Sequence, residues 1–212
     1  MMDFKQRILT TMNHEEPDRV PVMGLLAEPA TSNKVLGKPR AALASMLREP
    51  ELKNQIKDIM NLSWNEILYS TFADALEASV KLGFDANWTT YTLMQAVEAP
   101  QSMLGFNLHD VWGRVWEIRA DEDGEIVVNY IGGFLPAEEE WDVWIENNKP
   151  LFDRFIKGAA DHYSKLADNY GDKILPIGYT SVGIFTSTWQ SMGFVNFTRF
   201  VYQKPGFLKK VI

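Results

Sequence analysis

Short apolar runs that alternate with helix-like segments restrict the fold of this chain more than any other feature. Three runs have the composition of strands buried on both faces, and they span residues 20–26, 66–70 and 174–179. Apolar residues recur at helical spacing around these runs, in residues 3–12, 50–61, 74–82 and 150–170. Buried strands that alternate with helices are typical of a parallel sheet. The sequence therefore predicts an α/β fold.

Residues 110–133 have a different pattern. Two β-rich runs, 111–118 and 125–131, flank the acidic stretch Asp121-Glu122-Asp123-Gly124. A glycine that follows an aspartate between two such runs is a hairpin signal. The sequence predicts an antiparallel hairpin inserted at about 110–133 into the α/β chain.

Composition excludes several classes of function. The 212 residues carry a formal net charge of −7 and contain no cysteine, so they hold no disulfide framework, zinc ribbon or thiolate nucleophile. The acidic balance argues against nucleic acid as a partner. No signal peptide or apolar membrane span is recognisable, so we expect no membrane association and a cytoplasmic location. The three histidines lack metal-ligand spacing, and no metal site is expected from them.

Asp74 is the main candidate for a catalytic group. It follows the predicted strand at 66–70, and parallel barrels place catalytic side chains at the carboxyl ends of strands. The alternative is a helix N-cap, because an aspartate accepts hydrogen bonds from first-turn amides. On position alone the cap is the simpler interpretation.

Several motifs resemble the uroporphyrinogen decarboxylase superfamily when taken together. They are the stretch from Asn13 to Val22, the segment 174–179 followed by Gly183-Ile184-Phe185-Thr186, the run 200–205, and Phe72-Ala73-Asp74 with Gly83 after it. The family fold is a (β/α)8 barrel. With only three predicted strands, the resemblance implies that residues 1–212 are the N-terminal part of one such domain, an incomplete barrel. Asp110-Val111-Trp112-Gly113 is similar to the element that precedes a hairpin insertion in the methyltransferase-like branch.

The departures from the family pattern favour that branch. The family's decarboxylases carry an arginine loop after the first strand that binds the substrate's carboxylates. Here the matching residues, 24–30, contain no arginine and one glutamate. The resemblance therefore implies an enzyme that moves a methyl group between a cobalt corrinoid and a small acceptor. Its partners would be a corrinoid-carrying protein or a small-molecule substrate, with a homo-oligomer possible because open sheet edges associate.

Site residues follow from the same resemblance. It implies that Asp74 is catalytic and that Gly24, Tyr179 and Thr186 bind substrate at the barrel mouth. In the methyltransferase branch a zinc ion activates the acceptor, and its ligands would lie beyond these residues. Two alternatives stay open: uroporphyrinogen decarboxylation without a cofactor, with Asp74 stabilising the charged intermediate, and an inactive fragment or partner-binding half-barrel.

Overall fold

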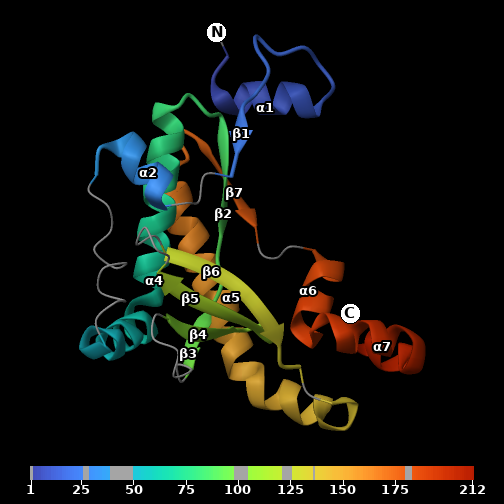
Figure 1. Ribbon diagram of the computed structural model, residues 1–212. Helices are drawn as coiled ribbons and strands as arrows, with labels where there is room; N and C mark the ends of the chain where they lie inside the picture. Colours follow the sequence, from blue (N-terminus) through green and yellow to red (C-terminus); the bar gives the residue numbers. More distant parts are fainter. Residues whose placement is uncertain are drawn as a thin grey trace. The chain divides into compact units, whose positions relative to one another are not determined.

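The computed structural model of the chain describes residues 2–25, 29–38, 50–97, 105–120, 126–135, 137–179 and 183–212. Within these ranges it contains helices and two small sheets, one parallel and one antiparallel (Figure 1). This confirms a mixed α/β structure, and the described ranges form no closed barrel. None of the helices in the described ranges is both long enough and apolar enough to cross a membrane. The chain divides into two compact units.

The first unit contains the parallel sheet. It comprises Met1–Ala41, Asn65–Tyr91 and Gly158–Thr180. The strands lie in the order β1-β2-β7 and are β1 (Met23–Gly24), β2 (Ala86–Thr90) and β7 (Leu175–Tyr179). The helices of this unit are α1 (Phe4–Met12), α2 (Pro29–Leu36), and parts of α4 (Pro50–Lys81) and α5 (Trp141–Tyr170).

The middle strand of this sheet is not the predicted one. Residues 66–70 and 74–82 were expected to be a strand and a helix, but both belong to the continuous helix α4. Leu68, Phe72, Leu76 and Ser79 are buried at helical spacing, so the apolar stretch is one face of a helix. A short apolar run does not by itself distinguish a buried strand from a buried helix. The strand that follows is β2, after Gly83 ends the helix with a φ of +79°.

The other two parallel strands are confirmed. The third is β7, close to its predicted bounds, whereas the first is reduced to the two residues of β1. Both pair with β2 in parallel, Met23 opposite Ala86 and Thr90 opposite Tyr179.

The second unit contains the antiparallel sheet. It comprises Ala42–Trp64, Thr92–Lys157 and Ser181–Ile212. Its strands are β3 (Met94–Val97), β4 (Gly105–Asp110), β5 (Arg114–Ala120) and β6 (Ile126–Gly133), paired in that order. The predicted hairpin is the β5–β6 pair, and its expected turn at Asp121–Gly124 lies outside the described residues. The insertion is larger than predicted because β3 and β4 extend it into a four-stranded sheet.

Asp110 holds the turn between β4 and β5. One carboxylate oxygen accepts hydrogen bonds from the backbone N–H groups of Trp112 (2.9 Å) and Arg114 (3.0 Å). The other accepts from Arg114 Nε (2.6 Å) and from the indole N–H of Trp116 (2.9 Å). Gly113 has a φ of +80°, which favours glycine. The Asp-Val-Trp-Gly motif is therefore a buried turn in this structure.

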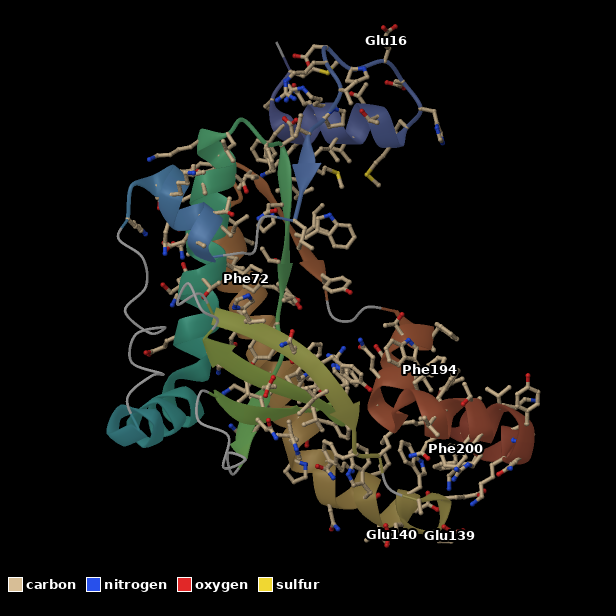
Figure 2. The ribbon with its side chains drawn as sticks, in the orientation of Figure 1. Glu16, Phe72, Glu139, Glu140, Phe194 and Phe200 are labelled. Carbon is tan, nitrogen blue, oxygen red and sulfur yellow. The ribbon has the colours of Figure 1, made fainter. Side chains whose placement is uncertain are left out.

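An aromatic cluster joins the helices of the second unit. Trp141, Met192, Phe197 and Phe207 are buried together. They come from the start of α5 and from α6 (Ile184–Met192), α7 (Phe194–Gln203) and α8 (Pro205–Val211). Phe200 packs against the cluster, whereas Phe194 on the same helix is 62% exposed (Figure 2).

Helix α5 begins earlier than predicted. It starts at Trp141, after the short 3-10 helix η1 (Glu138–Glu140), and Pro150 lies inside it. Acidic residues in the first turn complement the positive end of the helix dipole. Trp141 and Trp144 stack at 5.4 Å and pack this extra segment into the aromatic cluster.

Candidate functional site

The carboxyl ends of the parallel strands form the candidate site. Parallel strands end at the same edge of a sheet, and α/β proteins place their ligands there. Here β1 ends at Gly24 opposite Asn87, and β2 and β7 continue for three residues to Thr90 and Tyr179. Gly24, Thr90 and Tyr179 therefore mark the strand ends.

The two faces of this sheet differ in burial. Asn87 and Thr89 are fully buried, and Gly178 opposite Thr89 faces the ring of Tyr163 on α5, where an added Cβ would lie 3.4 Å from the ring. Side chains alternate along a strand, so Trp88, Thr90 and Tyr179 belong to the other face. Trp88 is 37% exposed and Met23 in β1 is 48% exposed. Tyr163 of α5 thus packs against one face at β7, where Gly178 is nevertheless exposed. The other face has the exposed side chains of Met23 and Trp88 beside the fully buried Ala86.

Trp88 and Tyr179 form an aromatic pair on the exposed face. Their rings meet edge to face with centroids 5.6 Å apart. Thr90 lies opposite Tyr179 in the register and adds a hydroxyl group at the strand end. The residues of this face (Met23, Trp88, Thr90, Ile177, Tyr179) include no carboxylate, imidazole or amine. Such a surface can hold a planar apolar group and orient it by hydroxyl hydrogen bonds.

Tyr163 ties the two longer strand ends together. Its hydroxyl donates a hydrogen bond to the backbone carbonyl of Tyr179 (2.9 Å) and accepts one from the backbone N–H of Tyr91 (3.1 Å). Burial raises the pKa of Tyr163, so the phenol keeps the proton that it donates. Tyr163 is therefore a positioning residue for the ends of β2 and β7.

Replacing Tyr163 with phenylalanine is expected to lower the free energy of unfolding by about 1–3 kcal/mol, because two buried backbone groups lose this partner. Urea unfolding measures the change, and amide exchange should accelerate at Tyr91. The matched control is Tyr170→Phe on the same helix, which should change stability little. Equal losses in the two variants would contradict the positioning role.

Gly24 leaves room for the Phe84 ring, which lies before β2, and its place in the register is opposite the buried Asn87. A Cβ at this position would come within 2.3 Å of the Phe84 ring, so β1 approaches the turn before β2 closely only because residue 24 has no side chain. The structure therefore brings Gly24 and Tyr179 into one sheet, as members of β1 and β7.

Asp74 does not lie at a strand end. It is in the interior of α4, so neither the predicted strand end nor the alternative N-cap is correct. Its carboxylate forms an ion pair with Lys38 (2.6 Å). Thr186 lies in the first turn of α6, which begins after Gly183, and is half-buried.

Trp88, Thr90 and Tyr163 were missed by the sequence analysis. A signal for the first two was present, because the helix-ending Gly83 precedes a run rich in aromatic and β-branched residues, from Trp88 to Thr92. Tyr163 gave no such signal, since it is one of several apolar residues on the stripe of α5. Its role depends on a contact with two distant segments.

Residues of the N-terminal motif lie at the amino ends of the strands. Asp85, immediately before β2, accepts hydrogen bonds from both Nη atoms of Arg19 (2.7 and 2.9 Å), from the backbone N–H of Val22 (2.8 Å) and from Arg7. Arg7 also binds Asp18 through Nε (2.7 Å). Burial opposes ionisation of Asp85, but these hydrogen bonds outweigh it and hold the pKa of Asp85 below its usual value. We name Arg7, Asp18, Arg19 and Asp85 the amino-end ion network.

The amino-end ion network joins the segment before β1 to the residue before β2, so we assign it a role in stability. Among the described residues, no three histidine, aspartate or glutamate side chains are grouped so as to hold a metal ion. The strand-end site therefore offers an aromatic surface and hydroxyl groups to a ligand.

No family model, no curated protein and no solved structure matches this chain.

Proposed function

We propose that this chain is part of a (β/α)8-barrel enzyme of the uroporphyrinogen decarboxylase superfamily, of the methyltransferase-like type. Its reaction is the transfer of a methyl group between a cobalt corrinoid and a small acceptor in the cytoplasm. The proposal depends on the motifs that resemble this superfamily and on the open face of the parallel sheet.

The strand order is compatible with the barrel. In the order β1-β2-β7, each strand lies next to the one that follows it among the parallel strands. A (β/α)8 barrel has this order throughout, and each half of a doubly wound sheet has it over three strands, so the order is compatible with the proposed barrel. The antiparallel strands between β2 and β7 interrupt the series in sequence without changing it in space.

The exposed sheet face is the single observation that carries the proposal. In a barrel, the helices cover the outer face of the strands and the inner face lines the interior. In the proposed barrel, the face that packs against α5 would be the outer one, and the face with Trp88 in the middle of β2 and Thr90 and Tyr179 at the strand ends would be the inner one.

The resemblance implies two groups, a corrinoid and a zinc ion, and the residues of the strand-end face fit the first. The Trp88 ring could stack on the flat macrocycle of a corrinoid, with the Tyr179 ring at 63° to it meeting the edge, and Thr90 could hydrogen-bond to its polar substituents. A corrinoid supplies the methyl group, and the chain's own residues bind and orient it. The described residues do not fit a zinc ion, because they include no cysteine and no group of three histidine, aspartate or glutamate side chains that could hold a metal. The proposed roles of these residues therefore do not involve zinc. Asp74 lies in α4 and pairs with Lys38, which follows α2, and its catalytic role stays a prediction. Thr186 likewise stays a predicted substrate-binding residue.

Titration of the chain with methylcobalamin, followed by tryptophan fluorescence, tests the proposal. We expect Trp88→Ala to weaken binding by about tenfold, the size of effect that loss of one aromatic stacking partner gives. Tyr202→Ala on α7 is the matched control, since Tyr202 is 86% exposed and far along the sequence from the sheet, and its affinity should equal that of the unaltered chain.

A parallel titration with uroporphyrin separates the alternatives. Binding of uroporphyrin without binding of methylcobalamin would favour a decarboxylase. Binding of neither, or an equal loss in both variants, would overturn the assignment of the strand-end face as a tetrapyrrole site. Circular dichroism spectra of the variants check that their fold is retained.

A further inference from the structure

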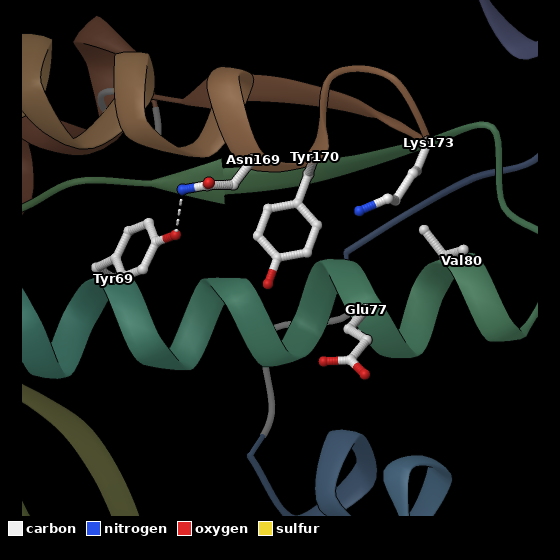
Figure 3. A pocket seen from close by; sticks show the side chains of 6 residues that line it. All are labelled: Tyr69, Glu77, Val80, Asn169, Tyr170 and Lys173. Atoms are coloured by element: carbon white, nitrogen blue, oxygen red, sulfur yellow. Dashed lines mark hydrogen bonds between the residues drawn. The ribbon is translucent and has the colours of Figure 1, made fainter.

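A pocket of about 560 Å³ lies between the last turns of α4 and α5, within the first unit. It is lined by Tyr69, Glu77, Val80, Asn169, Tyr170 and Lys173 (Figure 3). Tyr69, Val80 and Tyr170 are half-buried, and Glu77, Asn169 and Lys173 are exposed. The pocket therefore combines half-buried tyrosine and valine side chains with exposed polar groups, and its volume is in the range of small-molecule sites.

Some polar groups around this pocket are already paired. The Tyr69 hydroxyl accepts a hydrogen bond from Asn169 Nδ2 (2.8 Å), the dashed line in Figure 3. Lys165 Nζ lies 3.8 Å from the centre of the Tyr69 ring, and Lys38 binds Asp74. These contacts fix Tyr69 and leave the two nearby lysines engaged.

Three other groups in the lining form no close ion pair or hydrogen bond with the described residues: the Glu77 carboxylate, the Lys173 ammonium group and the Tyr170 hydroxyl. Glu77 acts at longer range on Lys38, whose pKa its charge helps to raise. Tyr170 extends from α5 toward α4 (Figure 3). Lys173 Nζ lies 5.8 Å from the centre of its ring. One anion, one cation and one hydroxyl group thus surround the same cavity.

The electrostatics distinguish two sides of the pocket. Burial raises the pKa of Tyr170, and Tyr69, Glu77 and Asp74 raise it further. The potential at the Tyr170 hydroxyl is therefore negative, which favours a ligand cation there. Lys173 is the cation in the lining and favours a ligand carboxylate.

We propose that this pocket binds a small zwitterion with an apolar body, of the α-amino-acid class. Its ammonium group faces Glu77 and the Tyr170 hydroxyl, its carboxylate faces Lys173, and its side chain contacts Val80 and the tyrosine rings. A neutral or singly charged molecule leaves one of the charged rim groups unmatched. The site is independent of the strand-end face and of the proposed methyl transfer.

L-phenylalanine is the probe for this proposal, with binding followed by NMR line shifts of the full chain. For a ligand of this size on a partly exposed rim, we expect a Kd on the order of 1 mM. Phenethylamine lacks the carboxylate and 3-phenylpropionate lacks the ammonium group. Each should bind at least fivefold more weakly than L-phenylalanine.

Two charge-removing variants test which group faces which residue. Glu77→Gln and Lys173→Met should each weaken L-phenylalanine at least fivefold. Glu77→Gln should leave 3-phenylpropionate unchanged, and Lys173→Met should leave phenethylamine unchanged. The matched controls, Asp161→Asn on α5 and Lys5→Met on α1, remove charges outside the lining and should not change binding.

All these side chains are exposed, so the variants are expected to fold, and urea unfolding verifies it. Absence of any shift with L-phenylalanine would overturn the proposal. So would equal binding of the three molecules, or equal weakening in the control variants.

Discussion

Replacing Asp85 with alanine is expected to lower the free energy of unfolding by about 3–5 kcal/mol, the cost of breaking a buried ion pair. Asp85 is the acceptor for Arg7, Arg19 and the Val22 amide at the amino ends of β1 and β2. Without it, the buried guanidinium of Arg7 keeps only Asp18 as a charge partner. Urea unfolding monitored by circular dichroism measures the change.

Asp74→Ala is the control for this variant. Asp74 also pairs with a basic residue, but the Lys38–Asp74 pair is partly exposed, and such pairs contribute about 0–1 kcal/mol. Both substitutions remove one negative charge, so the difference between their losses of stability measures the effect of burying the ion pair. A loss for Asp74→Ala as large as that for Asp85→Ala would show that the amino-end ion network is not the main electrostatic contribution to stability.

Acid should weaken the amino-end ion network in a defined pH range. The hydrogen bond from Arg7 lowers the pKa of Asp18 to about 2, and the pKa of Asp85 is also lowered. The stability that these carboxylates contribute is fully present above the ordinary aspartate pKa, near 4, and is lost as the pH falls through the lower folded values. Above pH 4.5 they should contribute no pH dependence.

Between pH 6.5 and 4, His162 is expected to dominate the pH dependence of stability. It lies on α5 and is 5% exposed. The rings of Tyr69, Phe72, Tyr91 and Tyr163 surround it, with centroids 5.4 to 6.3 Å away. Burial and the Lys165 charge lower the pKa of His162 to about 4. The unfolded chain then binds this proton more readily than the folded chain, so stability falls as the pH drops from about 6.5 to 4, by about 3 kcal/mol in total.

His162→Phe should remove this dependence. Phenylalanine keeps a ring among the four aromatic neighbours and has no titratable group. Within the described ranges, neither nitrogen of His162 has a hydrogen-bond partner that the substitution would remove. The free energy of unfolding at pH 7.5 should therefore be equal or higher, and its decline toward pH 4.5 should be nearly absent. An unchanged decline in the variant would assign the dependence to other groups, such as His109, whose pKa burial also lowers.

Helix α4 shows why part of the fold could not be predicted. Residues 66–70 are apolar enough for a buried strand, and the helical spacing is clear only when Leu68 is considered together with Phe72 and Leu76. The true strand β2 has Asn87 and Thr89 fully buried, which a polarity pattern assigns to a surface. Packing against the covered face of the sheet outweighed that pattern.

The candidate site was predicted in part. Gly24 and Tyr179 were placed in β1 and β7 because their strands were identified correctly, whereas Asp74 was misplaced together with the strand assigned before it. Trp88 and Thr90 could be recognised only after β2 was known. An error in one strand therefore became an error in where Asp74 was expected to lie.

The sequence by itself determined the α/β class, two of the three parallel strands, the β5–β6 hairpin and the end of α4 at Gly83, because local periodicity and turn residues encode these features. The tertiary structure decided which strand lies in the middle of the sheet and which face is open. It also brought Tyr163 to the strand ends and Asp85 to two arginines. These features depend on contacts between residues far apart in the chain, which no local pattern records.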